Sequence, residues 1–174
     1  VMNEQRKVIY QLRREILSDQ ENLGLVKGMI EDVSEMLLAA YRPGHKTPIE
    51  QWPWKEMAKS FQATFNTNKE ISDDECLKEF DNDIDKYFAV TALELLEQKL
   101  SQYDEEQIKI AAREILLSTF DQFWKDHLLA MDHVKEGINL RAYAQKDPLT
   151  EYKRESFNLF EEMRSQIKKA IVEN

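Results

Sequence analysis

The sequence is poor in helix-breaking residues and in cysteine. Its 174 residues include four glycines, four prolines and one cysteine, Cys76. So few glycines and prolines cannot separate the many short strands of a β-sandwich or barrel. A single cysteine excludes an internal disulfide framework and a cysteine-based zinc site, and it favours a reducing compartment such as the cytosol. The sequence therefore predicts an all-α fold.

Long apolar runs and an excess of positive charge are also missing. The longest apolar runs, such as residues 36–41, fall far short of the roughly 20 residues that span a bilayer, and the first residues do not form the apolar segment of a signal peptide. The net charge is −9, and residues 69–106 carry all of this excess, with four cations against thirteen anions. Because phosphate contacts need a basic stripe, we expect no nucleic-acid partner.

Sites for a nucleotide or a reactive nucleophile lack their sequence signatures. A P-loop needs clustered glycines whose amides hold phosphate, whereas the four glycines are scattered between positions 24 and 137. Cys76 lies in an acidic first helical turn, which opposes thiolate formation, so we interpret it as a half-buried structural residue. The sequence predicts no catalytic residue.

Two groups of residues resemble metal ligands, but their spacing argues against a metal. The acidic run 81–85 imitates the first ligands of an EF-hand loop, yet Lys86 stands where that loop requires glycine. His127 and His133 are six residues apart, about 240° around a helix, so one helix cannot direct both at the same ion. We interpret both histidines as surface residues and expect no metal site.

A long helix is predicted at the start of the chain. Apolar residues recur there at spacings of three and four, and only Asp19 interrupts the series. The stripe consists of Ile9, Leu12, Ile16, Leu23, Val26, Ile30, Val33 and Leu37. A continuous helix over residues 1–41 would be about 60 Å long, although a break at 22–24 stays open because of Gly24.

Residues 42–103 predict a second, smaller helical unit. Prolines keep the stretch from Pro43 to Pro53 irregular, and a short helix is expected over 55–64. Ser72 and Glu75 form a potential capping box, after which one helix is expected to run to about Ser101 with its acidic residues outward.

Residues 104–174 predict an antiparallel pair of helices. Asp104 with Gln107 offers a capping box for the first helix, and Gly137 is placed just after its end. Asp147 and Pro148 are typical of the N-cap and first position of the second helix.

The loop of this hairpin, at about 137–147, is unusually apolar for a connector. Residues 138–146 read INLRAYAQK, in which aliphatic residues and a tyrosine stand among cations. Such a tip is able either to press on another chain or to fold back onto its own helices, and the loop chemistry leaves both open. The residues alone therefore predict a helical interaction or mechanical module, with an enzyme as the weaker alternative.

Two stretches carry a resemblance to a known family. Residues 117–160, LSTFDQFWKDHLLAMDHVKEGINLRAYAQKDPLTEYKRESFNLF, closely resemble the SecA family, the ATP-driven motors of bacterial preprotein translocation. Residues 3–10, NEQRKVIY, resemble the start of that family's long scaffold helix. The resemblance implies a scaffold helix at 1–41, an inserted helical wing at 42–103, and a return to the scaffold as a two-helix finger at 104–174.

The resemblance also implies roles for particular residues. In the family, the finger enters the cytoplasmic funnel of the SecY channel, and a tyrosine at its tip contacts the preprotein in transit. The implied tip residues are Leu140, Arg141, Ala142 and Tyr143, with Ala142 where the family usually has glycine. The implied surface facing the motor domains consists of Ile9, Leu12, Ile16, Leu23, Val26 and Ile30.

Partners and cofactors follow from the same resemblance. The expected partners are the SecYEG channel, preproteins, and the nucleotide-binding and preprotein cross-linking domains of a longer parent protein, of which we expect this chain to be a fragment. ATP and magnesium would act in the parent, and the fragment alone is expected to be no enzyme and to bind no cofactor. The expected location is the cytoplasm, at the periphery of the inner membrane. A free-standing helical adaptor is the alternative.

Overall fold

The computed structural model describes residues 1–18, 21–44, 47–141 and 147–174. All elements within these ranges are helical, so the all-α prediction is confirmed. They are α1 (Met2–Ser18), α2 (Asn22–Ala39), the 3₁₀ helix η1 (Ile49–Gln51), α3 (Trp54–Thr64), α4 (Asp73–Glu79), α5 (Ile84–Leu100), α6 (Glu105–Arg141) and α7 (Pro148–Glu173).

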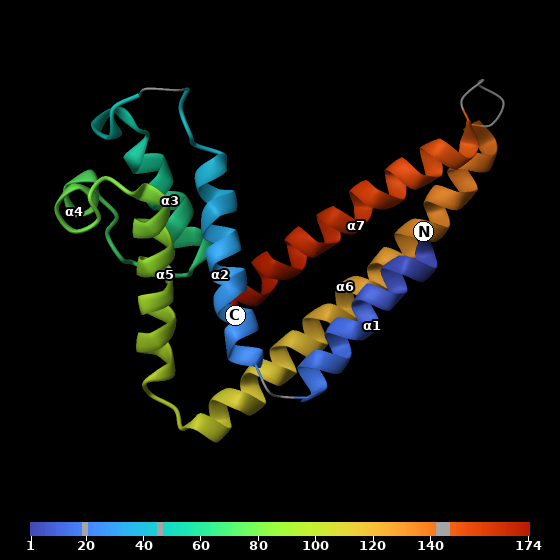
Figure 1. Ribbon diagram of the computed structural model, residues 1–174, viewed down its shortest axis with the longest axis horizontal. Helices are drawn as coiled ribbons and strands as arrows, with labels where there is room; N and C mark the ends of the chain where they lie inside the picture. The colour runs from blue at the N-terminus through green and yellow to red at the C-terminus, as the bar shows by residue number, and fades with distance from the viewer. Residues whose placement is uncertain (19–20, 45–46, 142–146) are drawn as a thin grey trace.

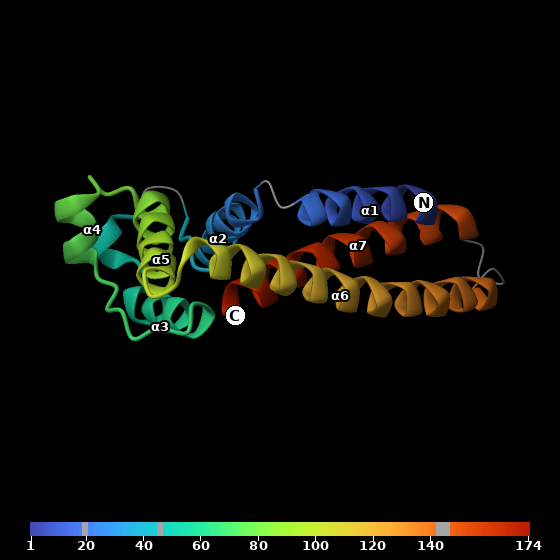
Figure 2. The ribbon, with the colours of Figure 1, turned by 90° about the horizontal axis from the view of Figure 1, so that it is seen from below.

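The helices form two groups that share α2. Figure 1 shows α6 and α7 as a long antiparallel pair, with α1 lying along α6; we call these three helices the arm. Seen from below in Figure 2, α2, α3, α4 and α5 gather at the opposite end of the molecule from the last turns of α6 and the first turns of α7; we call these four helices the cluster. The last turns of α7 pack against α2, which joins the arm to the cluster.

Each group has its own apolar core. The arm buries residues of α1, α6 and α7 with one residue of α2: Ile9, Ile16, Met29, Leu116, Phe120, Trp124, Phe160, Met163, Ile167 and Ile171. The cluster buries Ile30, Leu38, Met57, Phe61, Ile71, Cys76, Ile84, Tyr87, Phe88 and Ala92. Because Met29 faces one core and Ile30 the other, α2 is a wall common to both.

The long helix considered for residues 1–41 is divided in two, and the division lies just before the 22–24 break that was left open, not at Gly24. Helix α1 ends at Ser18 and α2 begins at Asn22. The buried side chain of Asn22 donates a hydrogen bond to the main-chain oxygen of Ile16 at 2.9 Å. This bond satisfies a carbonyl in the last turn of α1, where intrahelical partners run out. The apolar stripe therefore continues in two helices: α1 packs into the arm core, and α2 packs into both cores.

The helix expected from Ser72 to about Ser101 is also interrupted. Helix α4 ends at Glu79, and Asp81 and Asn82 both have positive φ angles, 50° and 68°. Asp and Asn adopt this left-handed conformation more readily than most residues. Asp83 then caps α5 by accepting a hydrogen bond from the amide of Lys86 at 3.0 Å.

Helix α6 is the longest element in the described part of the chain and extends past the predicted loop. Its 37 residues correspond to about 55 Å. Gly137 lies inside it, so the placement of Gly137 after a helix end is wrong. Ile138, which is 5% exposed, continues the buried face beyond the glycine. No helix in the described ranges is long and apolar enough to cross a membrane.

Candidate functional site

The α6–α7 pair is a stiff projection built on a long apolar seam. Along α6, buried residues recur at helical spacing, from Leu116 through Phe120 and Trp124 to Met131 and Ile138. This spacing places them on one face of the helix, opposite the buried face of α7. Bending either helix would open this seam and expose its apolar side chains to water.

The return helix of this pair starts with a fixed cap. Asp147 accepts a hydrogen bond from the amide of Leu149 at 3.3 Å and from the hydroxyl of Thr150 at 2.5 Å. These two hydrogen bonds lower the pKa of Asp147 below its ordinary value, the Thr150 bond having the larger effect. Pro148, whose missing amide is tolerated at the first helical position, begins α7.

The implied tip residues fall at the end of α6 and beyond it. Leu140 and Arg141 belong to the last turn of α6. Ala142 and Tyr143 lie outside the described residues, and so does the position at which alanine replaces the family's usual glycine.

A buried polar tie joins all three helices of the arm. Gln5 of α1 donates from its side-chain nitrogen to the main-chain oxygen of Ser156 in α7 at 3.0 Å. Its side-chain oxygen lies 2.9 Å from Nε2 of His127 in α6. Because a carbonyl oxygen only accepts, the first bond fixes the orientation of the amide, and Nε2 of His127 must be the donor in the second. All three residues are at most 7% exposed.

The imidazole of His127 is held in an aromatic slot. It stacks on Trp124, with ring centroids 5.4 Å apart, and tilts against Phe160 at 5.7 Å. Burial lowers the pKa of His127 below its ordinary value of 6.5, so the neutral ring is favoured. The interpretation of His127 as a surface residue is wrong. Its position three residues after Trp124 and four before Met131 was the available signal, because that spacing belongs to the buried stripe.

Ion pairs at the surface of the arm should stabilise it less than this buried tie does. Arg13 of α1 donates to both carboxylate oxygens of Asp121 in α6, at 3.0 and 3.2 Å. Lys168 of α7 contacts Asp32 of α2 at 2.6 Å. The Arg13 and Asp121 side chains are 45% and 52% exposed, so solvent and salt screen the attraction between them.

Half of the apolar residues implied to face the motor domains are buried against other helices of this chain. Ile9 and Ile16 are buried in the arm core, and Ile30 is buried in the cluster core. Leu12, Leu23 and Val26 are only partly exposed. A residue covered by its own chain cannot also be a docking surface, so the motor-facing role is wrong for Ile9, Ile16 and Ile30.

Other apolar residues do reach the surface of the arm. On α1, Tyr10 is 58% and Leu17 is 52% exposed, and their separation of seven residues places them on one face. On α7, Leu149 and Phe157 are also exposed, at 58% and 63%. These side chains are available to a partner, as is Leu129 of α6 at 60% exposed, and sequence reasoning did not single them out.

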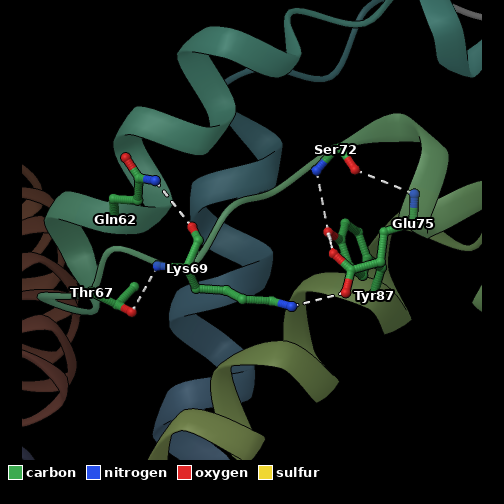
Figure 3. Close-up of polar contacts among 6 residues, drawn as sticks. All are labelled: Gln62, Thr67, Lys69, Ser72, Glu75 and Tyr87. Carbon is green, nitrogen blue, oxygen red and sulfur yellow. Dashed lines mark hydrogen bonds and ion pairs between the residues drawn. The ribbon is translucent and has the colours of Figure 1, made fainter.

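The cluster contains a polar network around Glu75 (Figure 3). Tyr87 donates its hydroxyl to Glu75 at 2.6 Å, and Lys69 donates to the other carboxylate oxygen at 2.9 Å. Burial opposes the charged carboxylate, but these two bonds outweigh it and lower the pKa of Glu75. Ser72 accepts from the Glu75 amide at 3.3 Å, while its own amide donates to the Tyr87 hydroxyl. Only one half of the predicted capping box therefore forms.

The same network anchors the irregular segment before α4. Gln62 donates to the main-chain oxygen of Lys69 at 3.0 Å, and the Lys69 amide donates to the Thr67 hydroxyl at 3.1 Å (Figure 3). Nearby, Cys76 is fully buried, more than expected, and burial with the charge of Asp83 raises the pKa of its thiol to about 11. These groups hold the cluster together and offer no open reactive atom.

Metal ligands do not converge in the described ranges. Within them, no group of three or more His, Cys, Asp or Glu side chains is placed to hold a metal ion. The features that stand out in these ranges are a long helix pair, a buried tie to α1, and exposed apolar side chains on its outer faces.

Comparison with known proteins gives a consistent result. The family described as the SecA wing and scaffold domain matches residues 1–174. Proteins named protein translocase subunit SecA are similar as well: that of Rickettsia felis is 38% identical over 177 residues, covering 99% of this chain and 19% of the relative. That of Geobacter sp. strain M21 is 38% identical over 173 residues, covering 99% and 18%. The chain thus spans about a fifth of the length of the curated relatives it matches.

Proposed function

The chain belongs to the SecA wing and scaffold domain family, and we propose that it couples ATP-driven movement of a translocation motor to a finger that contacts the preprotein. In this proposal, α6 and α7 form the finger, α1 forms the scaffold helix beside it, and residues 42–103 form the wing. Residues 19–41, with α2, connect the scaffold to the wing.

The observation that supports the proposal is the construction of the arm. The finger helices are long, and their seam is apolar from Leu116 to Ile138. The Gln5 amide bonds to both of them at once, through His127 of α6 and Ser156 of α7. A displacement of α1 therefore carries both finger helices, because sliding either one would leave buried polar groups without partners.

The finger would act at its tip. Tyr143 combines a flat apolar face with a hydroxyl, which suits contact with varied extended segments without reading their sequence. In the sequence, the tip lies between the end of α6 at Arg141 and the capped start of α7 at Pro148. We propose Leu140, Arg141, Ala142 and Tyr143 as the contact region.

The nucleotide chemistry belongs elsewhere in this proposal. The glycines are scattered along the chain, and the described residues place no metal-binding group. We propose that ATP and magnesium act in the remainder of a complete SecA protein. We also propose the SecYEG channel and preproteins as partners, and a location at the cytoplasmic face of the inner membrane.

A chimaera tests the proposal. This chain replaces the corresponding region of the Geobacter relative, and ATP-dependent entry of a preprotein into inner-membrane vesicles is measured. We expect translocation in the chimaera and a several-fold loss in its Tyr143→Ala variant. Tyr103→Ala, which removes a tyrosine that is 55% exposed at the α5–α6 junction, is the matched control and should retain the chimaera's rate.

A second exchange makes a negative result informative. A chimaera with the Rickettsia felis region in the same place shows whether the Geobacter protein tolerates an exchange at all. If that chimaera translocates while the one with this chain folds but does not, the coupling role is wrong. The free-standing adaptor would then be the better account.

A further inference from the structure

The α6–α7 pair continues beyond the part of the arm that has a core and a third helix. Figure 1 shows the end of α6 and the start of α7 extending past the first residues of α1. The core residues nearest to this end are Trp124 on α6 and Phe160 on α7, and the tie through His127 and Ser156 lies beside them. We call the part of the pair beyond the tie, residues 129–141 and 148–155, the outer end.

Few side chains are buried in the outer end. On α6, Met131 and Ile138 are 2% and 5% exposed, and no residue between them is buried. On α7, none of residues 147–155 is buried. Since local stability depends on the number of buried apolar contacts, the outer end should be less stable than the part of the arm that contains the core.

Gly137 weakens the helix within this end. Its φ angle is not positive, so the main-chain conformation does not require glycine. A Cβ atom at this position would contact nothing within 4 Å outside its own stretch of α6, so packing does not require glycine either. Glycine inside a helix makes the helical state about fivefold less favourable than alanine does. The residue therefore lowers the stability of the last turns of α6 without improving any contact.

We propose that the outer end opens and closes while the rest of the arm stays folded, with Gly137 as the point on α6 at which it opens. On opening, the amides of residues 138–141 lose their hydrogen bonds to carbonyls one turn earlier, and the start of α7 separates from α6. The tie is the inner limit, because opening past it would leave buried polar groups without partners.

The role of this opening rests on the proposed function. The end of the pair that meets the preprotein would adapt its shape to successive segments of different bulk, while the tied part of the arm keeps its position. The opening itself is a property of this chain, so it can be measured without any translocation partner.

Native-state hydrogen exchange of this chain tests the opening. Corrected for their intrinsic rates, the amides of residues 138–141 should exchange at least about a hundredfold faster than those of residues 116–124. Low concentrations of urea should leave exchange at 138–141 unchanged, because a local opening exposes little surface. The same concentrations should speed exchange at 116–124, which requires larger unfolding.

Two variants locate the opening. Gly137→Ala should slow exchange at 138–141 about fivefold. Gly28→Ala is its matched control, because Gly28 also lies inside a helix with no neighbour within 4 Å, in α2 at the other end of the molecule, and it should leave exchange at 138–141 unchanged. Ile138→Ala should speed exchange at 138–141 and in the first turns of α7 together, by at least about tenfold.

Translocation by the Geobacter chimaera tests the role separately. Gly137→Ala should slow translocation several-fold, and Gly28→Ala should leave its rate unchanged. Exchange at 138–141 as slow as at 116–124, or unchanged by Gly137→Ala, would refute the separate opening whether or not the chimaera translocates. Slower exchange with an unchanged rate of translocation would refute the adaptive role. Loss of translocation in the chimaera itself, while the Rickettsia felis exchange is active, would refute the proposed function and this role, and the exchange results would still decide the opening.

Discussion

Truncation of Gln5 is the sharpest test of the buried tie. Gln5→Ala removes the hydrogen bond to the Ser156 carbonyl and the one from His127. Each bond contributes about 0.5–1.5 kcal/mol, and an unpaired buried donor costs about 1–3 kcal/mol. His127 is 4% exposed, so its Nε2–H group loses its acceptor inside the arm. We expect the free energy of unfolding to fall by about 2–4 kcal/mol.

The assay is urea unfolding followed by far-ultraviolet circular dichroism, with Gln11→Ala as the control. Gln11 lies on the same helix and bonds to Glu15 at 2.9 Å on the exposed surface, so its loss should cost no more than about 0.5 kcal/mol. Equal losses for the two variants would refute the assigned role of the tie.

A double-mutant cycle separates the tie from simple packing. His127→Phe keeps an aromatic ring between Trp124 and Phe160 but removes the donor. If Gln5 and His127 act through their bond, the double variant should lose less stability than the two single losses added together, by about 1 kcal/mol or more. Strict additivity would contradict this reasoning even if Gln5→Ala alone were destabilising.

Three further predictions concern the rest of the molecule. Folding lowers the pKa of His127 below 6.5, so the unfolded chain takes up a proton first as the pH falls. The free energy of unfolding should therefore decrease below about pH 6.5, by at most about 1.4 kcal/mol per pH unit. Urea titrations at several pH values should show a weaker pH dependence in His127→Phe than in the unchanged chain. Tyr87→Phe loses the hydroxyl that links Glu75 to the Ser72 amide and should cost about 1–2 kcal/mol in the same assay, and a cost near zero would contradict the network. Phe157→Ser changes a side chain that is 63% exposed, so the melting temperature should stay within a few degrees, and a large drop would show that Phe157 is buried against the arm.

Much of the architecture could be predicted from helical periodicity. Scarce glycine and proline predict the all-α fold, and the two long apolar patterns predict the α6–α7 pair. Asp104 with Gln107 forms the reciprocal capping box that its spacing predicts, with bonds of 3.1 and 2.8 Å. Helix periodicity and capping depend on residues that are close together in the sequence, so both can be recognised without the structure.

The errors share a physical cause, which is competition between local propensity and tertiary contacts. Gly137 resembles a helix end, but continued packing at Ile138 extends α6 past it. The stripe from Ile9 to Leu37 resembles one rod, but Asn22 bonds back to Ile16 and the chain turns to a second core. His127 depends on Gln5, 122 residues away, and no local pattern contains that partner.

The central claim is that the far end of the α6–α7 pair touches the polypeptide in transit. The most direct measurement places a photo-crosslinking amino acid at position 143 of the Geobacter chimaera, stalls a preprotein during import into vesicles, and identifies the captured chain. The account predicts that the preprotein is captured in the presence of ATP. Capture of only the chimaera's own helices would contradict it, because the hairpin would then be a brace that never meets the substrate.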